Sequence, residues 1–176
     1  MNCEINKNRN GIWSIIAVVS IFVLTIFDQF TKYLAIEHLK NKNPFVLISD
    51  VLELHYLENN GMAFGLFSGK IPFFVITCLL FLIFAVFFFW KIPKTRFYAP
   101  VISIEFVLIA GAIGNFIDRV WRGYVVDFIY VKLIDFPIFN VADIYVVMSC
   151  ILLVILILFK YEDSDFKFLS LKNKEN

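Results

Sequence analysis

Four long apolar segments divide the sequence, and they predict four transmembrane helices. The predicted spans are residues 11–32, 71–90, 97–117 and 138–159. At a rise of 1.5 Å per residue, about 20 residues cross a hydrocarbon core of roughly 30 Å, so each segment is long enough. The first apolar run leads into Asp28 without a small-residue cleavage motif, which favours an uncleaved span over a removable signal peptide.

The segments that connect the spans carry a second pattern. Residues 40–69 alternate apolar and polar side chains from 51 to 58 and then reach Asn59-Asn60-Gly61, which predicts a strand and a turn. The apolar stretch 123–131 is too short to span a membrane, so we expect it to lie against the membrane surface or the helix bundle. The predicted fold is a single all-α membrane domain over residues 1–176 with a small extracytoplasmic β element. The tail, residues 161–176, receives no role.

Composition supports the membrane interpretation and narrows the chemistry. Of the 176 residues, 60% are hydrophobic and only 18% are charged, against roughly 25% charged in a typical soluble domain. The net charge of +1 makes a nucleic-acid partner unexpected. The three cysteines lie far apart and the two histidines are unpaired, so we predict no disulfide, no metal and no cofactor. They are Cys3, Cys78, Cys150, His38 and His55.

Basic residues in short connectors predict the orientation. Lys91, Lys94 and Arg96 lie between the second and third spans, and Lys7 and Arg9 precede the first. Because Lys and Arg collect in cytoplasmic loops, both termini should be cytoplasmic. Residues 37–70 and 118–137 should then face outward.

Polar side chains gather near the outer boundary of the predicted bundle, which suggests an outward-facing site. Most of them lie within about five residues, or roughly 8 Å, of an outer span end, and the others lie in the outer loops. These groups are Asp28, Asn59, Asn115, Asp118, Arg119, Asp127, Asn140 and Asp143. A carboxylate inside an apolar segment is costly, so it indicates function by default.

The spacing of these residues indicates acid and base chemistry. Asn115 precedes Asp118 by three positions, and Asn140 precedes Asp143 by three, so each Asn is expected to orient its Asp neighbour. Two carboxyl groups in a poorly hydrated pocket cannot both ionise easily, which leaves one acid and one base, as in aspartic proteases. No Ser or Cys in an outward-facing segment has a His beside it, which argues against a nucleophilic mechanism.

Several of these residues also have plain structural interpretations. Asp28 and Lys32 are four apart and fit an ion pair at a helix end, and Asp118 beside Arg119 fits a local salt bridge. Asp143 fits a charge at a helix N-terminus. Glu105 fits an interior hydrogen-bonding group or a partly protonated one rather than a catalyst. Gly111 and Gly114 fit close helix contacts, and Asp50 and Asp135 fit solvated charges. A small transporter, a scaffold and a lipid-modifying membrane enzyme remain alternatives.

Five motifs resemble, in order, those of the bacterial lipoprotein signal peptidase family, signal peptidase II. The motifs are Asp28-Gln29-Phe30-Thr31-Lys32, Asn59-Asn60-Gly61-Met62-Ala63-Phe64, Gly114-Asn115-Phe116-Ile117-Asp118-Arg119, Gly123-Tyr124-Val125-Val126-Asp127-Phe128 and Phe139-Asn140-Val141-Ala142-Asp143. The resemblance implies an aspartic endopeptidase of the bacterial inner (cytoplasmic) membrane, with four helices and no cofactor. It implies a prolipoprotein substrate whose cysteine carries diacylglycerol, cut on the amino side of that cysteine at the surface of the membrane lipid. It also implies inhibition by globomycin-type compounds.

The same resemblance implies a role for each matched residue. Asp127 and Asp143 correspond to the catalytic aspartates. The other matched residues correspond to positions that line or support the site: Asn59, Asn115, Arg119 and Asn140 near the substrate, and Asp28, Lys32 and Asp118 behind them. Reasoning from the residues alone does not choose Asp127 over Asp118.

Overall fold

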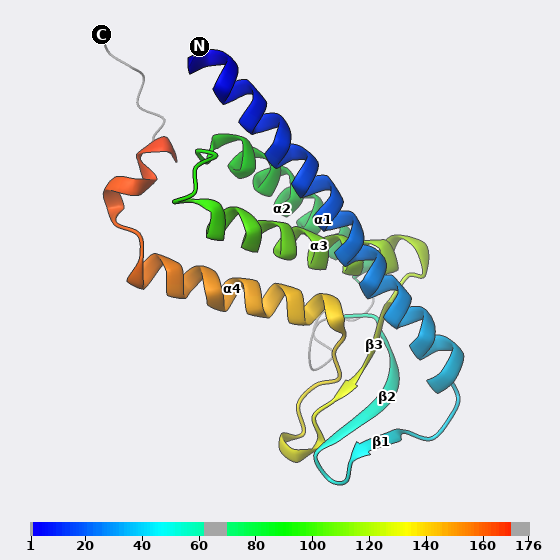
Figure 1. The fold of residues 1–176 in the computed structure, drawn as a ribbon. Helices are drawn as coiled ribbons and strands as arrows, with labels where there is room; N and C mark the ends of the chain where they lie inside the picture. The colour runs from blue at the N-terminus through cyan, green and yellow to red at the C-terminus, as the bar shows by residue number, and fades with distance from the viewer. Residues whose placement is uncertain (1, 62–69, 170–176) are drawn as a thin grey trace.

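The protein forms a bundle of four long helices with a small sheet at one end (Figure 1). The structure is a computed structural model, and it describes residues 2–61 and 70–169. The helices are α1 (Asn2–Leu39), α2 (Ile71–Lys91), α3 (Ala99–Trp121) and α4 (Val141–Phe159). Within the described residues, these four are long and apolar enough to cross a membrane, which confirms the predicted fold class.

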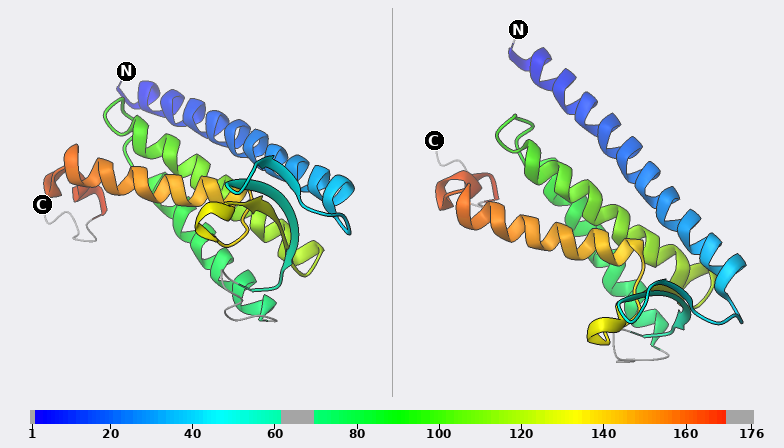
Figure 2. Two further views of the ribbon diagram at one scale, coloured as in Figure 1. Left: turned by 90° about the horizontal axis from the view of Figure 1, so that it is seen from below. Right: turned by 60° about the horizontal axis from the view of Figure 1, so that its bottom comes forward.

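Helix α3 occupies the centre of the bundle. It packs against α1, α2 and α4. In an 18-residue apolar stretch of α3, 44% of the residues are buried, compared with 6–11% in the corresponding stretches of the other three helices. Two views from other directions show the remaining helices arranged around it (Figure 2). A bundle this open exposes its apolar side chains outward, as expected where lipid replaces water.

Prolines and a lysine mark the ends of α2 and the start of α3. Pro72 and Pro100 lie in the first turns, where the missing N–H removes no helical hydrogen bond. Lys94 follows the end of α2, and its ammonium donates to the carbonyls of Phe89 and Ile92, the second at 3.1 Å. A cation at a helix C-terminus complements the carbonyl dipoles there.

The sheet has three antiparallel strands in the order β1-β2-β3. Strand β2 (Leu52–Asn59) lies in the connector after α1 where the alternation predicts a strand, and β1 (Phe45–Ile48) precedes it without having been predicted. Residues 62–69 of that connector lie outside the described residues. Strand β3 (Val125–Tyr130) pairs with β2. The stretch 123–131 lies against the helix bundle as expected, since Val126 and Phe128 pack with Ala35 of α1. What was not expected is that most of it is a strand that completes the sheet.

Helix boundaries differ from the hydropathy boundaries where polar residues continue a helix. Helix α1 extends well beyond residues 11–32, and α3 continues past residue 117 to Trp121, so Asp118 and Arg119 are helical. Helix α4 begins at Val141 rather than at 138, because Phe139 pairs with Ile129 of β3. Hydropathy locates the lipid-facing part of a helix, not its last hydrogen bond.

Aromatic packing closes the end of the bundle farthest from the sheet, called the tail end here. A short 3-10 helix, η3 (Asp163–Leu169), returns to the α2–α3 connector, where the Tyr98 hydroxyl donates to the Asp165 carbonyl at 2.7 Å. The rings of Tyr98 and Tyr161 stack with centroids 5.9 Å apart. Residues 170–176 of the tail lie outside the described residues.

Glu105 lies in α3 toward the tail end and is 4% exposed. Neither of its carboxylate oxygens has a hydrogen-bond partner among the described residues, so the interpretation of Glu105 as an interior hydrogen-bonding group is wrong, whereas its partial protonation stays a prediction. The predicted small-residue contacts are present, since a Cβ at Gly111 would lie 2.6 Å from the Ala142 carbonyl oxygen of α4. Asp50 and Asp135 have left-handed backbones, and their carboxylates contact Lys132 and Tyr130 respectively.

Candidate active site

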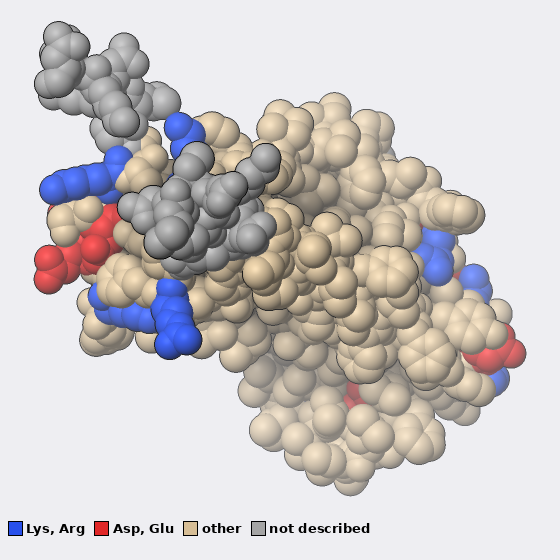
Figure 3. Space-filling model, turned by 45° about the horizontal axis from the view of Figure 1, so that its top comes forward, with Lys and Arg blue, Asp and Glu red and all other residues tan. Residues whose placement is uncertain are grey.

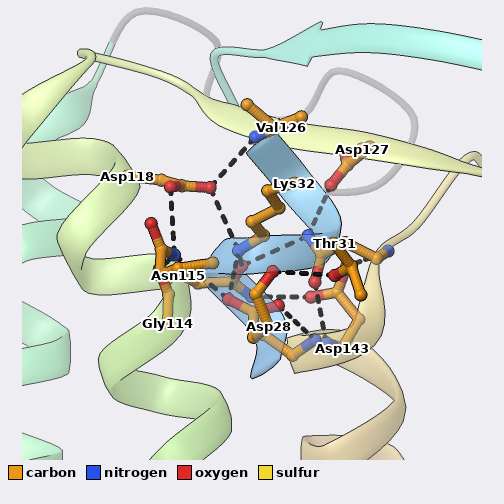
Figure 4. Close-up of polar contacts among 12 residues, drawn as sticks. Asp28, Thr31, Lys32, Gly114, Asn115, Asp118, Val126, Asp127 and Asp143 are labelled. Atoms are coloured by element: carbon orange, nitrogen blue, oxygen red, sulfur yellow. Dashed lines mark hydrogen bonds and ion pairs between the residues drawn. The ribbon is translucent and has the colours of Figure 1, made fainter. Parts of the chain in front are cut away.

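Lys32 lies at the centre of a buried polar cluster at the sheet end of the bundle (Figure 4). Its ammonium, with no exposed surface, lies 2.9 Å from Asp28, 3.0 Å from Asp118 and 2.9 Å from the Asn115 side-chain oxygen. Three acceptors thus face three N–H bonds, which is how a buried ammonium avoids an uncompensated desolvation cost. The predicted contact between Asp28 and Lys32 is confirmed, but it lies inside the protein rather than at an exposed helix end.

Asp28 ties the first helix to the fourth. One of its oxygens accepts from the Ala142 N–H in the first turn of α4 at 2.9 Å, and the other accepts from Lys32. That second oxygen lies where a Cβ at position 114 would stand, so Gly114 lets α3 approach the carboxylate. A side chain at position 114 would force the two helices apart.

Asp118 ties helix α3 to the sheet, as Asp28 ties α1 to α4. It is fully buried, and one oxygen accepts from the Val126 backbone N–H of β3 at 3.2 Å. Its other oxygen contacts Arg122 rather than Arg119, so the predicted salt bridge between Asp118 and Arg119 is wrong. The helical register explains the change, because residue 122 lies one turn beyond 118 on the same face whereas residue 119 points elsewhere.

Arg119 turns toward α2 and the loop after β2. Its guanidinium carbon lies 4.8 Å from the centroid of the Phe74 ring, and its nitrogens lie 3.4 Å from the Gly61 carbonyl and 3.5 Å from the Asn115 carbonyl. An arginine held by a ring face and weak carbonyl contacts keeps donors for a further acceptor.

Asp143 lies in the first turn of α4, where its backbone and side chain both take part in the cap. Asn140 is the N-cap residue, its side-chain oxygen accepts from the Asp143 N–H at 3.0 Å, and its own N–H donates to the Asp143 carboxylate at 3.1 Å. The predicted position at a helix N-terminus is confirmed. The second carboxylate oxygen of Asp143 accepts from the Asn115 side chain at 2.7 Å.

Asp127 reaches the same cluster from strand β3 and is 2% exposed. One carboxylate oxygen accepts from the Asn59 side chain at 2.8 Å and the other from the Asn140 side chain at 2.6 Å. Figure 4 shows the Asp127 side chain descending from the strand while Asp143 lies at the start of the helix below it. Residues far apart in sequence thus bring two carboxyl groups into one polar cluster.

Asn140 connects the two aspartates directly. Its side-chain nitrogen donates to Asp127 at 2.6 Å and to Asn115 at 3.2 Å, while its oxygen and its backbone N–H bind Asp143. The expected pairing of Asn140 with Asp143 is therefore confirmed. Asn115 instead contacts Lys32, Asn140 and Asp143, so its expected pairing with Asp118 is wrong.

The environment of Asp127 favours a bound proton. Burial, and secondly the negative charge of Asp143, raise the pKa of Asp127 to about 7 from an ordinary value of 3.8. The amide hydrogen bonds from Asn59 and Asn140 and the charge of Lys32 act in the opposite direction. Near neutral pH, Asp127 can thus donate a proton. The neighbouring Asp143 carboxylate accepts hydrogen bonds from the Asn115 side chain and the Asn140 backbone N–H. This arrangement can perform general acid and base chemistry.

Gln29 and the Val126 backbone are parts of the site that sequence reasoning did not assign. The Gln29 amide donates to Asp28, Asp118 and the Gly114 carbonyl at 3.1–3.3 Å, which joins α1 to α3. Its place beside Asp28 was a usable signal, because a polar residue next to a buried charge within an apolar span requires partners. Across residues 2–61 and 70–169, no three His, Cys, Asp or Glu side chains form a group suited to a metal ion.

Comparison with known proteins identifies the family. The model of the family described as "Signal peptidase (SPase) II" matches residues 20–159, which is most of the chain. The chain belongs to the signal peptidase II family. Family membership makes it a protease, which is a hydrolase, and its four apolar helices agree with a multi-pass bacterial membrane protein.

Individual relatives agree with the assignment to signal peptidase II. The lipoprotein signal peptidase of Staphylococcus aureus (strain MRSA252) is 43% identical over 144 residues, which cover 80% of this chain and 86% of that protein. The protein of strain JH9 is 42% identical over the same length. A bacterial membrane enzyme solved by the in meso method at 2.3 Å resolution superposes with a TM-score of 0.74 at 37% identity and covers 90% of this chain and 93% of that one. A second such structure at 1.9 Å resolution gives 0.73 at 39% identity, with 83% and 94% covered.

Proposed function

We propose that the protein removes signal peptides from prolipoproteins whose cysteine carries diacylglycerol, cutting on the amino side of that cysteine. The observation that carries the proposal is the convergence of Asp127 and Asp143 on Asn140 within a signal peptidase II chain. The other three candidates, a small transporter, a scaffold and a lipid-modifying enzyme, have no such support, because the polar groups gather at the sheet end and family membership favours proteolysis.

Asp127 acts as the acid and Asp143 as the base. The raised pKa of Asp127 supports the first role, and the N–H donors around Asp143, which suit an ionised carboxylate, support the second. Asp143 takes a proton from water, whose oxygen adds to the scissile carbonyl carbon while Asp127 protonates the carbonyl oxygen. The C–N bond of the resulting diol then breaks as the amine nitrogen takes the proton from Asp143, and Asp127 regains its proton from a diol hydroxyl.

Supporting residues fix the positions of the two aspartates. Asn59, Asn115 and Asn140 hold the carboxylates by amide donors, and Arg119 offers donors to a substrate carbonyl. Behind them, Lys32 with Asp28 and Asp118 joins the helices that carry the site. Rigid support of this kind keeps reacting groups within the small tolerance that catalysis allows.

The sheet lies outside the cytoplasm and both termini lie inside. Three cations at the α2–α3 connector support this orientation, although Lys94 is buried against helix carbonyls rather than free to anchor at lipid headgroups. Thiol labelling of intact cells tests it, with single cysteines in place of Asn41 near the sheet and Ser164 in η3. An impermeant reagent should modify the first and spare the second. The reverse pattern would invert the topology.

A cleavage assay tests the activity. Purified protein in lipid vesicles should cut a diacylglyceryl-modified precursor and leave the unmodified precursor largely intact, and a globomycin-type compound should inhibit the reaction. Equal cleavage of both precursors would show that the enzyme does not recognise the diacylglyceryl group. Absence of cleavage by well-folded protein would contradict the proposal as a whole.

A further inference from the structure

The far edge of the sheet exposes apolar side chains that the catalytic site does not use. All four residues of β1 are exposed, by 49–58%, so neither face of this strand is covered by protein. A second exposed group follows β3, where Leu133, Ile134 and Phe136 are exposed by 66%, 67% and 49%. Soluble proteins cover or charge such an edge, because a bare apolar strand promotes aggregation.

These two groups belong to one surface, called the sheet tip here and defined as residues 45–48 together with Leu133, Ile134 and Phe136. The Leu133 N–H donates to the Val51 carbonyl at 3.4 Å, at the turn between β1 and β2. Next to it, the Lys132 ammonium lies 2.9 Å from Glu53 and 3.3 Å from Asp50. Asp135, between Ile134 and Phe136, accepts from the Tyr130 hydroxyl at 2.6 Å. The tip is therefore an apolar surface bordered by charged side chains that have polar partners.

The position of the tip limits what can cover it. It is joined to the end of α1 through residues 40–44 and to the start of α4 through residues 137–140, so it stays at the level where those spans leave the membrane. Figure 1 shows the sheet below the ends of α1 and α4 to which it is joined. Figure 3 shows charged side chains at two ends of the molecule and, between them, a surface that is almost entirely uncharged, with one small acidic spot on the lobe below.

We propose that the sheet tip is immersed in the interfacial region of the leaflet on the sheet side of the membrane, with lipid covering β1 and the loop 133–136. Lipid is favoured over a protein partner because the tip continues the lipid-facing surface of the bundle and is tethered to it. Paired charges beside apolar side chains suit the boundary between headgroups and acyl chains. The apolar side chains enter the acyl region, and Lys132 with Asp50 stays among the headgroups.

Immersion of the tip would set the height of the catalytic groups. The Phe136 ring lies 5.7 Å from the Phe139 ring in an edge contact, and Phe139 immediately precedes the Asn140 cap. Fixing residue 136 in the interface therefore fixes the start of α4, and with it Asp143, relative to the lipid surface. This consequence rests on the proposed function, since it matters for a substrate whose cysteine is held at that surface by diacylglycerol. The immersion itself does not.

Fluorescence quenching in vesicles tests the immersion without requiring activity. Single cysteines replace Leu47 and Ile134 in full-length protein lacking its natural cysteines, and each is labelled with bimane in phosphatidylcholine–phosphatidylglycerol vesicles. Nitroxides near the headgroup end of lipid chains should quench both labels, iodide in the water should not, and both emission spectra should shift to the blue. A label in place of the exposed polar Asn43 serves as the matched control and should show the opposite pattern.

The alternatives give distinct results, and each would overturn the proposal. Strong quenching by iodide at Leu47 and Ile134 would place the tip in water. Protection from both quenchers, or lipid quenching that changes with the ratio of protein to lipid, would indicate a protein cover such as a second copy of the chain. Because the catalytic aspartates are not needed, the same measurement on the Asp127→Asn variant separates failure of this inference from failure of the proposed function.

The charged variant Leu133→Asp/Ile134→Asp tests the consequence for catalysis. Cleavage of the lipidated precursor in vesicles should fall by roughly tenfold, while cleavage in detergent micelles, where depth is not imposed, should be retained. Asn41→Asp/Asn43→Asp adds the same charge to the polar connector and should leave both rates unchanged. Equal loss in micelles and vesicles would show that the loop matters for folding or substrate contact rather than for depth.

Discussion

The two ends of the helix bundle are held together by different forces. At the sheet end, charged and amide side chains from α1, α3, α4 and β3 satisfy one another around Lys32, which contacts three acceptors. At the tail end, stacked rings such as Tyr98 and Tyr161 make the contacts, and Glu105 is buried with both carboxylate oxygens unpartnered among the described residues. Aromatic packing of the tail-end type is enough for stability. Burying charged groups is costly, so the polar cluster at the sheet end marks the place where the positions of charged groups serve function.

The largest effect should come from the two aspartates. Asp127→Asn and Asp143→Asn should each reduce cleavage of the lipidated precursor by roughly 10³-fold or more, because one variant loses the proton donor and the other loses the base. Membrane insertion and thermal unfolding in detergent should change little, since Asn retains the size of Asp. Measurable turnover near the normal rate in either variant would remove the proposed pair and with it the functional contrast between the ends.

Loss of the central cation should have the next largest effect. Lys32→Met leaves Asp28 and Asp118 buried without their shared cation, so the free energy of unfolding should fall by about 3–5 kcal/mol. Lys40→Met is the matched control, because its ion pair with Glu58 is exposed and should contribute at most about 1 kcal/mol. Unfolding in detergent measures both variants. An equal loss of unfolding free energy in the two variants would show that the buried cluster stabilises the protein no more than the exposed ion pair does.

The pH profile should report the proton on Asp127. Since the pKa of Asp127 is raised to about 7, kcat/KM should fall as the pH rises through that value and the acid is lost. Asn59→Ala removes a hydrogen bond that lowers this pKa, so the alkaline limb should move upward by about one pH unit. A downward shift, or no alkaline limb in the wild-type protein, would reverse the assignment of acid and base.

The same raised pKa makes stability depend on pH in a defined direction. The folded state binds a proton on Asp127 that the unfolded chain releases near pH 4, so the free energy of unfolding should decrease as the pH rises from about 4 to about 7. Asp127→Asn should flatten that part of the curve. Unfolding measured in detergent across this pH range would show an unchanged slope if another group were responsible.

The smallest effects should come from the tail end. Tyr98→Phe loses the hydrogen bond to Asp165 and should lower the free energy of unfolding by about 1 kcal/mol. Glu105→Gln keeps the shape of the side chain and should leave cleavage within roughly twofold of normal, because among the described residues the Glu105 carboxylate has no hydrogen bond that could couple it to the aspartates. Loss of activity in Glu105→Gln with normal stability would mean that the two ends are not functionally separate.

The sequence predicted the spans and the polar end of the bundle because both depend on local pattern. Long runs without charge identify the helices, and a carboxylate within such a run stands out. Strand β3 was not recognised because its first four residues are all buried, so the alternation that identifies a half-exposed strand is missing.

Partner choice within the cluster was beyond local reasoning. Asn115 contacts Lys32 and Asp143 on two other helices instead of its neighbour Asp118, and Asp118 supports β3. Those contacts depend on how α1, α3 and α4 pack, which spacing along one helix does not reveal. The family resemblance selected Asp127 over Asp118 as a catalytic residue, and the geometry supports that choice because Asp118 is occupied by Lys32, Arg122 and the strand.

Asn140 both caps helix α4 and donates hydrogen bonds to Asp127 and Asn115, and few other amino acids can do both. Beginning α4 requires an oxygen that accepts from the Asp143 backbone, which Ser, Thr and Asp also supply. Contacting Asp127 and Asn115 together requires two hydrogens on the same side chain, which a hydroxyl lacks and an ionised carboxylate lacks entirely. A substitution that preserves the N-cap of α4 would thus still abolish catalysis. The substitutions tolerated at residue 140 should therefore depend on the number of side-chain N–H donors rather than on helix-capping strength.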